Sequence, residues 1–255
     1  MTAGERRLEG KNALVTGAAR RIGRAISLAL AREGANVAVH YSSSESEAAE
    51  LAAEIEGLGV QSVALGADLS DPDALASLVD YAREALGTLE ILVNNASIFP
   101  SDTLETVDLE GLQRNLELNA WAPLVLMRAF AAQSERGHVI NLLDSRVSGF
   151  DRTHTAYILS KHVLSAITRT AALELAPGIA VNGIAPGLIL APAGESEEYV
   201  DRLAQTVPLK RHGTPEDIAA AAVYLVTSEF VTGETIYVDG GRHLKEYFPD
   251  GPDSR

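Results

Sequence analysis

Short apolar runs rich in valine, isoleucine and leucine alternate along the chain with longer amphipathic stretches. Several of the short runs are apolar at successive positions, so both faces of a strand are expected to be buried, as in a parallel sheet that helices cover on both sides. The predicted strands are Asn12–Thr16, Asn36–His40, Ser62–Gly66, Ile91–Asn94, His138–Leu143, Ala180–Ile184 and Thr235–Val238.

The stretches between these runs carry apolar residues at helical spacing. Two of them open on a capping residue followed by proline, at Asp71-Pro72 and Thr214-Pro215, which is typical of helix starts. The predicted helices are Arg21–Glu33, Glu45–Leu58, Asp73–Leu86, Leu109–Gln133, Thr155–Ala176 and Pro215–Thr227. This alternation predicts right-handed crossovers and a Rossmann-like, doubly wound α/β fold, with a seven-stranded parallel sheet between two helical layers.

The pattern predicts one domain over residues 1–255, because no linker, repeat or low-complexity tract divides it. A substrate loop is expected over about 188–207. Its least regular part is Ala191–Glu198, and a short helix-like segment follows to Thr206. The tail 243–255 carries Pro, Gly and Asp, so we expect it to be poorly structured.

Composition removes several function classes. There is no cysteine, which excludes disulfides, thiolate catalysis and cysteine-ligated metals, and the six histidines show no metal-ligand spacing. The formal net charge of −14 disfavours nucleic acid and anionic membranes as partners. The polar start of the chain and the lack of a membrane-length apolar run predict a cytoplasmic protein with a small-molecule substrate.

The first predicted strand runs into a turn of small and basic residues, Thr16-Gly17-Ala18-Ala19-Arg20-Arg21-Ile22-Gly23, and a helix follows. Small residues let the backbone approach a pyrophosphate, and the helix N-terminus offers free N–H groups. Glycine spacing alone is a weak signal, and an ordinary helix cap is the alternative. The position in the first βα turn favours a dinucleotide site that uses Gly17, Arg20, Arg21, Ile22 and Gly23.

The end of the second strand predicts NADP(H) rather than NAD(H). NAD binders usually place an acidic residue there to bind the ribose 2′-OH. Here the strand ends His40-Tyr41-Ser42, and the first acid, Glu45, opens the next helix. A histidine, hydroxyl groups and the nearby Arg20 suit a 2′-phosphate. The alternative is that His40 and the serines only cap that helix.

Tyr157 and Lys161 lie four residues apart in a predicted helix, about one turn apart on one face. A nearby ammonium lowers the pKa of a phenol from about 10 and makes it a better proton-transfer group. This spacing is common by chance, and taken alone it fits a core tyrosine beside a solvated lysine equally well.

Other motifs in the chain favour a catalytic role for the Tyr157–Lys161 pair. Asn94-Asn95-Ala96 follows the fourth strand, Asn119 lies in the next helix and Pro186-Gly187 follows the sixth strand. With the glycine turn, they resemble the short-chain dehydrogenase/reductase family from about Lys11 to Gly241. The resemblance implies that Tyr157 exchanges the substrate proton, that Lys161 lowers its pKa and holds the nicotinamide ribose, and that Asn119 organises a relay water. It also implies a homo-oligomer, preferably a tetramer, and further cofactor contacts from Asp68, Leu69, Asn95, Ala96, Pro186 and Gly187.

Three departures narrow the substrate. Asp144 stands where the family usually has serine, Arg21 replaces a glycine of the turn, and the Asn-Asn-Ala motif continues Ser97-Ile98-Phe99. Together they resemble the pteridine reductase branch, which implies a site for a flat pterin ring made by Arg21, Ser97, Phe99, Asp144 and Tyr157. An ionised Asp144 would oppose Lys161 and keep a proton on Tyr157.

Each departure also has a simpler interpretation: Phe99 packing on the protein, Arg21 as a surface charge, or Ser145 acting in place of Asp144. The leading hypothesis is NADPH-dependent reduction of a dihydropterin or dihydrofolate. A general carbonyl or 3-oxoacyl reductase is the alternative, and a non-catalytic nucleotide-binding scaffold is the third.

Overall fold

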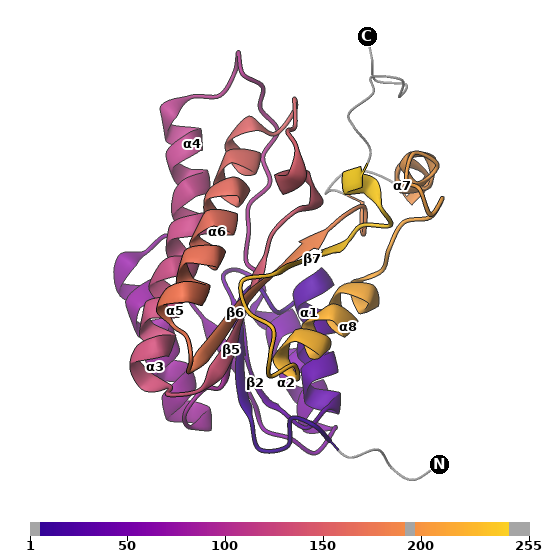
Figure 1. The fold of residues 1–255 in the computed structure, drawn as a ribbon. Coiled ribbons are helices and arrows are strands. Elements are labelled where there is room, and N and C mark those ends of the chain that lie inside the picture. The colour runs from indigo at the N-terminus through magenta and orange to yellow at the C-terminus, as the bar shows by residue number, and fades with distance from the viewer. Residues whose placement is uncertain (1–5, 192–196, 245–255) are drawn as a thin grey trace.

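The computed structural model describes residues 6–191 and 197–244, and one parallel sheet forms its centre (Figure 1). The spatial order of the strands is β3-β2-β1-β4-β5-β6-β7, and all neighbouring pairs are parallel. The predicted doubly wound sheet of seven strands is confirmed. The strands are β1 (Asn12–Val15), β2 (Asn36–Tyr41), β3 (Ser62–Gly66), β4 (Ile91–Asn94), β5 (Gly137–Leu142), β6 (Ile179–Pro186) and β7 (Thr235–Val238).

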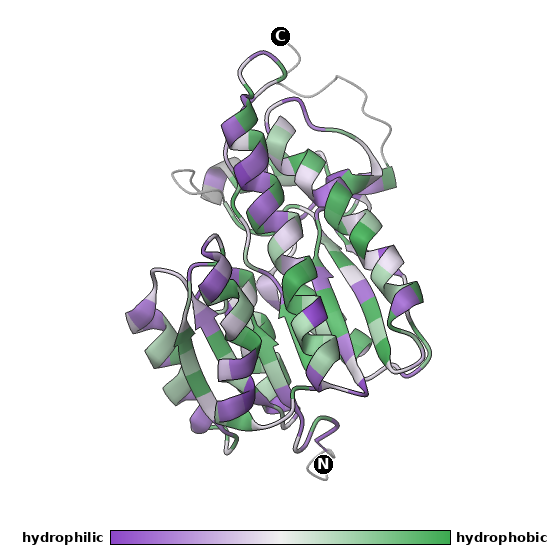
Figure 2. Cartoon of the chain, turned by 90° about the vertical axis from the view of Figure 1, so that its left-hand side faces the viewer, coloured by the Kyte–Doolittle hydropathy of each residue, from purple (hydrophilic) through white to green (hydrophobic). Residues whose placement is uncertain are grey.

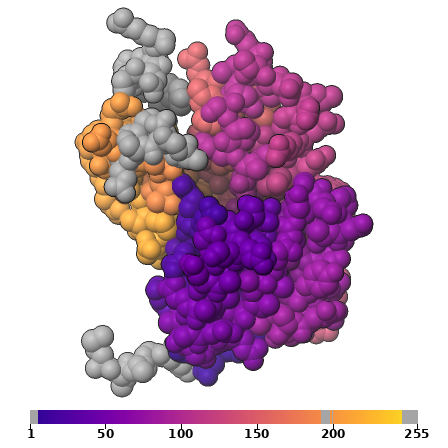
Figure 3. Space-filling model, turned by 180° about the vertical axis from the view of Figure 1, so that it is seen from behind, coloured from indigo at the N-terminus to yellow at the C-terminus, as the bar shows by residue number. Residues whose placement is uncertain are grey.

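Helices cover both faces of this sheet (Figures 1 and 2). One layer contains α1 (Arg21–Arg32), α2 (Glu45–Glu56) and α8 (Pro215–Val226), and α1 packs on α8. The other contains α3 (Pro72–Leu86), α4 (Leu109–Leu116), α5 (Ala122–Gln133) and α6 (Thr155–Glu174). From behind, the first part of the chain, in indigo and purple, forms the lower body of the molecule (Figure 3).

The central strands show why the sequence folds in this way. All residues of β1 and β4 are buried, and successive side chains belong to different cores. Ala13 and Val15 pack under the α1–α2–α8 layer, whereas Leu14 packs under the other layer. A strand that alternates between two apolar cores is apolar along its length, as residues 13–15 and 91–93 are, and the polar Asn12 and Asn94 lie at the ends of the two strands.

The predicted helix Leu109–Gln133 is not continuous. It is divided into α4, a π-helical segment η1 (Glu117–Trp121) and α5. Pro123 lies in the first turn of α5 and has no N–H to donate to the carbonyl of Asn119, so the regular ladder is interrupted there. Asn119, a predicted site residue, therefore lies in the irregular segment.

Two predictions about irregular segments have mixed outcomes. The helix-like stretch after the sixth strand is confirmed as α7 (Glu197–Ala204), while residues 192–196 lie outside the described part. The expectation of a poorly structured tail from 243 is wrong for its first two residues, which belong to the 3₁₀ turn η3 (Arg242–Leu244). Asp239 accepts the backbone N–H of His243 at 2.6 Å, and the His243 ring stacks on Tyr237. Residues 245–255 lie outside the described part.

The outer faces of α4, η1 and α6 carry exposed apolar side chains, among them Leu109, Trp121, Leu159 and Leu173. Assembly through these helices stays a prediction. Within residues 6–191 and 197–244, no helix combines the length and apolar character needed to span a bilayer.

Candidate active site

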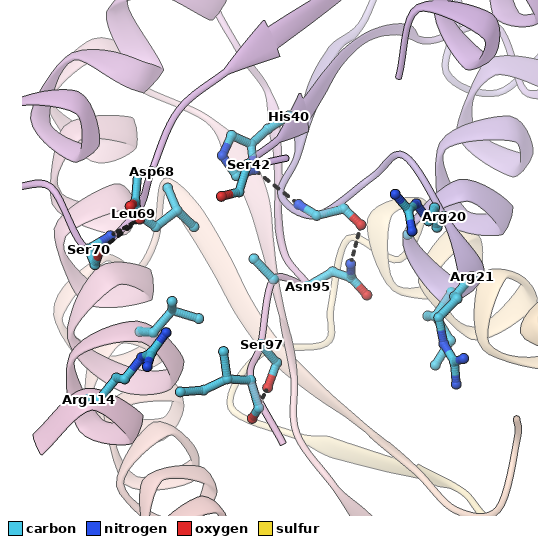
Figure 4. A pocket seen from close by; sticks show the side chains of 16 residues that line it. Arg20, Arg21, His40, Ser42, Asp68, Leu69, Ser70, Asn95, Ser97 and Arg114 are labelled. Atoms are coloured by element: carbon cyan, nitrogen blue, oxygen red, sulfur yellow. Dashed lines mark hydrogen bonds between the residues drawn. The ribbon is translucent and has the colours of Figure 1, made fainter. Parts of the chain in front are cut away.

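The carboxyl ends of β1 and β4 are joined by hydrogen bonds at the point where the strand order reverses, which is where open α/β sheets bind ligands. Thr16 Oγ1 accepts the backbone N–H groups of Asn95 and Ala96, at 2.9 and 3.0 Å. The Asn95 amide donates to the carbonyl of Thr16 at 2.8 Å and to that of Gly17 at 3.0 Å, and Figure 4 shows the second bond. The two strand ends thus fix the shape of the turn between β1 and α1.

Two glycines of this turn are required, Gly17 by space and backbone conformation and Gly23 by space alone. Gly17 has a φ of +60°, in the left-handed region, and a Cβ there would lie 3.0 Å from the Cα of Ala96. A Cβ on Gly23 would lie 2.4 Å from the carbonyl oxygen of Gly17. Arg21 also has a positive φ, of 55°, at the position where the family usually has glycine. The turn therefore keeps a glycine conformation there at a cost of about 1–2 kcal/mol.

A cavity of about 520 Å³ opens beyond this turn. Arg20 and Arg21 lie at one end of it, and Asp68, Ser70 and Arg114 at the other (Figure 4). The predicted site residues that line it are Gly17, Arg20, Arg21, Ile22, Gly23, His40, Ser42, Asp68, Leu69, Asn95, Ala96 and Ser97. Those outside its lining are Tyr41, Phe99, Asn119, Asp144, Tyr157, Lys161, Pro186 and Gly187.

Two of the residues outside the lining have local structural roles. A Cβ on Gly66 would meet the Tyr41 hydroxyl at 2.9 Å, so the Tyr41 ring lies over Gly66 on the neighbouring strand. A Cβ on Gly187 would come within 2.5 Å of the Asp239 side chain. Gly187 therefore permits the close approach of the segments that follow β6 and β7, whatever it contributes to a cofactor.

His40 lines the cavity with both ring nitrogens already bonded. Nδ1 accepts the backbone N–H of Gly17 at 3.0 Å, so Nε2 carries the proton and donates to the Ala67 carbonyl at 3.1 Å. Burial lowers the pKa of His40, although the Ala67 bond opposes this effect. Both ring nitrogens are used, so the expectation that the His40 ring binds a phosphate is corrected. The neutral His40 ring stabilises the turn through its hydrogen bonds.

The positive charge at this end of the cavity comes from the turn itself. Arg20 pairs with Glu47 of α2 at 2.8 Å, and both side chains are exposed. Arg21 donates to the carbonyl of Ala191 at 2.9 Å. Arg21 is exposed, and this bond connects the first turn of the fold to the loop after β6.

Tyr157 and Asp144 form the centre of the second group of predicted residues. The Tyr157 hydroxyl donates to Asp144 Oδ2 at 3.0 Å. Lys161 lies one turn further along α6, with Nζ 5.6 Å from the Tyr157 ring centroid, and it donates to the Leu142 carbonyl at 2.7 Å. Tyr157 and Lys161 are both buried. The carboxylate of Asp144, not the buried Ser145, is thus the partner of the phenol.

The environment favours a protonated phenol. Burial raises the pKa of Tyr157 well above its ordinary value, and the charge of Asp144 raises it further. Burial also lowers the pKa of Lys161 to about 8, with Asp144 opposing. The lowering of the Tyr157 pKa that was expected from Lys161 is therefore outweighed by burial and by Asp144.

Arg146 is the main site residue that sequence reasoning missed. It follows Asp144 by two residues, in the 3₁₀ turn η2 (Ser145–Ser148). Burial alone would raise the pKa of Asp144, but the hydrogen bonds and charge of Arg146 outweigh it, so this pKa lies below its ordinary value. No motif in the sequence signals this arginine, since its role depends on how the turn folds.

Phe99 lies against the phenol, as the pterin interpretation expects, but it also packs on the protein. Its ring meets Tyr157 edge to face, with centroids 4.6 Å apart and planes at 84°. It stacks on His154 with centroids 4.0 Å apart and planes at 12°. Its side chain is still 40% exposed. One aromatic face is thus largely occupied, and the ring keeps surface for a ligand.

Asn119 holds the segment that leads to Phe99. Its amide oxygen accepts Ser97 Oγ at 3.1 Å and the backbone N–H of Ile98 at 3.0 Å. Its amide nitrogen lies 3.1 Å from the Ile98 carbonyl and 3.0 Å from Ser160 Oγ on α6. Asn119 therefore connects the loop after β4 to the helix that carries Tyr157.

A family model described as enoyl-(acyl carrier protein) reductase, one of the short-chain dehydrogenase models, matches residues 17–243. This match spans the turn from Gly17 onward, the end of β4 and the Tyr157–Lys161 helix. The chain belongs to the short-chain dehydrogenase/reductase family. As a member it is an oxidoreductase, although the description of the model does not define its substrate.

Individual members of the family differ in activity. The chain is 34% identical over 242 residues to the 3-oxoacyl-[acyl-carrier-protein] reductase FabG of Staphylococcus epidermidis, covering 92% of this chain and 99% of that protein. It is also 34% identical over 253 residues to an L-rhamnose 1-dehydrogenase (NAD(P)(+)) of Sphingomonas sp., covering 93% and 98% of the two chains.

A solved structure with a different activity is similar over the whole fold. It is the FolM alternative dihydrofolate reductase 1 from Brucella canis, in complex with NADP. The two chains are 34% identical with a TM-score of 0.91, and the match covers 97% of this chain and 99% of that one. Within the short-chain dehydrogenase/reductase family, overall similarity thus leaves the substrate open, and the site residues must decide between candidates.

Proposed function

We propose that this short-chain reductase reduces a pterin of the dihydropterin or dihydrofolate type with NADPH, using Tyr157 as the proton donor. The observation that carries the proposal is the hydrogen bond from Tyr157 to Asp144, with Phe99 edge-on to the same phenol. A carboxylate at this position and an aromatic ring beside it suit a flat, electron-poor heterocycle.

The reaction requires a hydride and a proton. Reduction of a C=N bond places hydride on carbon and a proton on nitrogen, and NADPH, when bound, supplies the hydride. At neutral pH Tyr157 holds this proton, because burial and Asp144 raise its pKa and keep the phenol neutral. Lys161, with Nζ 5.6 Å from the Tyr157 ring centroid, provides the positive charge that stabilises the phenolate left by the transfer. Overall, one NADPH and one proton convert the dihydropterin to a tetrahydropterin and NADP⁺.

The cavity beyond the glycine turn fits a dinucleotide. The turn and the start of α1 provide N–H groups for the pyrophosphate, and Asp68 and Leu69 lie at the opposite end, where the adenine would bind. Ser42 and Arg20 also line the cavity, where they would contact the 2′-phosphate of the same adenosine. The NADP bound to the Brucella canis relative supports this assignment.

We expect kcat/KM to be at least about tenfold higher for NADPH than for NADH, because an Arg20–phosphate pair contributes about 1.5–3 kcal/mol. Arg20→Ala should remove most of this preference by impairing NADPH use while leaving NADH use nearly unchanged. Arg24→Ala is the matched control, since Arg24 lies in α1 outside the cavity lining and pairs with Glu54 of α2 as Arg20 pairs with Glu47. A wild-type preference for NADH would contradict the NADP assignment.

Asp144→Ser tests the pterin assignment, because it restores the residue usual in the family. NADPH oxidation is followed with dihydrobiopterin, dihydrofolate and an acetoacetyl thioester. We expect wild type to prefer the pterins and Asp144→Ser to lose roughly 10²-fold on them, with a much smaller loss on the thioester. Equal losses on all three would contradict a pterin-specific role of Asp144.

A 3-oxoacyl thioester reductase is the second candidate, and the FabG relative of Staphylococcus epidermidis favours it. In that case wild type would prefer the acetoacetyl thioester, and Asp144→Ser would retain or increase its rate. If none of the three substrates supports NADPH oxidation, both candidate functions are contradicted.

A further inference from the structure

Arg146 is held by two carboxylates beside the catalytic phenol. Its Nε and one Nη donate to Oδ1 and Oδ2 of Asp144, at 3.0 and 2.9 Å, in a bidentate pair. Its other Nη pairs with Asp151. A guanidinium that is bound on two sides in this way has a fixed orientation, and it fixes the orientation of its partners.

The carboxylate of Asp144 is fully used by these contacts. Oδ1 accepts the backbone N–H and Nε of Arg146, at 2.9 and 3.0 Å. Oδ2 accepts Nη2 of Arg146 at 2.9 Å and the Tyr157 hydroxyl at 3.0 Å. A carboxylate offers about four lone-pair positions, so none remains for a substrate donor. Asp144 therefore acts on the substrate through Tyr157.

The second carboxylate extends the contacts to the aromatic side of the site. Asp151 accepts the backbone N–H of Thr153 at 2.8 Å and contacts His154 Nδ1 at 3.0 Å. The His154 ring is the one that stacks on Phe99. The guanidinium carbon of Arg146 itself lies 5.2 Å from the Phe99 ring centroid and 5.7 Å from that of Tyr157.

We propose that Arg146 is the positioning residue of the proton-donor site, which directs Asp144 onto Tyr157 and, through Asp151, braces the His154–Phe99 ring pair. The inference rests on the proposed function, since it takes Tyr157 as the proton donor. It assigns the two carboxylates different effects: Asp144 controls the chemical step, and Asp151 controls the aromatic surface that receives the substrate.

The charges around Asp144 determine the expected pH dependence. Arg146 and Asp151 face it from η2 and the following loop, and Tyr157 and Lys161 face it from α6. Removing Arg146 leaves burial as the dominant effect, so the pKa of Asp144 should rise. Asp144 would then be protonated at a higher pH, and the loss of activity on acidification should begin at a higher pH.

The test measures kcat, KM and their pH profiles for Arg146→Met and Arg146→Lys. We expect Arg146→Met to lower kcat roughly 10- to 100-fold, to move the acid limb to higher pH and to leave NADPH binding within about twofold. Arg146→Lys should recover part of kcat. Asp151→Asn should mainly raise KM for the pterin, and Arg152→Met, an exposed arginine of the same loop, should match wild type.

The decisive comparison is a double-mutant cycle. If Arg146 acts through Asp144, Asp144→Asn combined with Arg146→Met should be no slower than Asp144→Asn alone. If the kcat losses of the two substitutions multiply in the double variant, the proposal is overturned. It is also overturned if the acid limb of the pH profile does not move in Arg146→Met.

A measurement without substrate separates this inference from the proposed function. Because the pKa of Asp144 is lowered in the fold, its pairing with Arg146 contributes stability above its ordinary pKa that is lost as pH falls. The Tm difference between wild type and Arg146→Met should therefore be largest near pH 7 and should shrink as pH falls through and below 3.8, the ordinary pKa of an aspartate. A Tm difference that does not change with pH would overturn the Arg146–Asp144 pairing. If the Tm difference changes as expected but no pterin is reduced, only the proposed function is contradicted.

Discussion

Tyr157→Phe is expected to lower kcat/KM roughly 10³-fold, within the 10²–10⁴-fold range of a positioned general acid. The substitution removes only the hydroxyl that donates to Asp144 at 3.0 Å. The ring keeps its edge contact with Phe99, and Asp144 keeps its bidentate pair with Arg146. The loss should therefore appear in kcat, and NADPH binding measured by fluorescence should change little.

Tyr224→Phe provides the control, because Tyr224 is an exposed tyrosine on α8, away from these residues. It should leave the kinetics unchanged. A loss below tenfold in Tyr157→Phe, with the protein still folded, would show that the phenol is not the proton donor.

Lys161→Met is expected to lower kcat/KM by at least about 10²-fold and to raise Tm at pH 7. Lys161 is buried, and burial lowers its pKa from 10.5 to about 8. At about 1.4 kcal/mol per pKa unit, its charged form costs about 3 kcal/mol of stability, as an order of magnitude. Methionine has a similar length and needs no solvation, so the variant avoids this cost.

The sign of the pH dependence follows from the direction of this shift. Below pH 8 the ammonium is charged in the folded and unfolded states, and the full cost is present. Between pH 8 and 10.5 the folded state loses its proton first, so wild type should gain stability relative to the variant. Thermal melts at pH 7 and pH 10 measure this. The control is Lys210→Met on the exposed surface, and a Tm advantage of Lys161→Met that does not shrink by pH 10 would contradict the buried-charge account.

Much of the fold could be predicted from local chemistry, because the relevant residues act on near neighbours. The side chain of Asp71 accepts the N–H of Asp73 at 2.9 Å, and Thr214 forms a reciprocal cap with Asp217. Both helix starts are as the sequence predicts. The i,i+4 spacing also correctly placed Tyr157 and Lys161 near each other on one helix.

The parts that escaped prediction depend on distant contacts. Arg146 matters because η2 turns it back onto Asp144 and because a later loop supplies Asp151. Arg114 reaches the cofactor cavity from α4 without belonging to any motif. The π-helical segment around Asn119 requires knowing how Pro123 interrupts a helix whose apolar pattern continues. Periodicity describes the average element and does not register such local interruptions.

The hydrogen bonds of His40 also identify a part of the fold that acid would destabilise. Its Nδ1 can accept the Gly17 N–H only while the imidazole is neutral. Because burial lowers the pKa of His40, the neutral form contributes stability above about 6.5, and this contribution disappears as pH falls through the lowered pKa. A second proton would set two N–H groups against each other beneath the phosphate turn. Acid would therefore disturb the turn proposed to bind the nucleotide, through a residue other than the proposed proton donor.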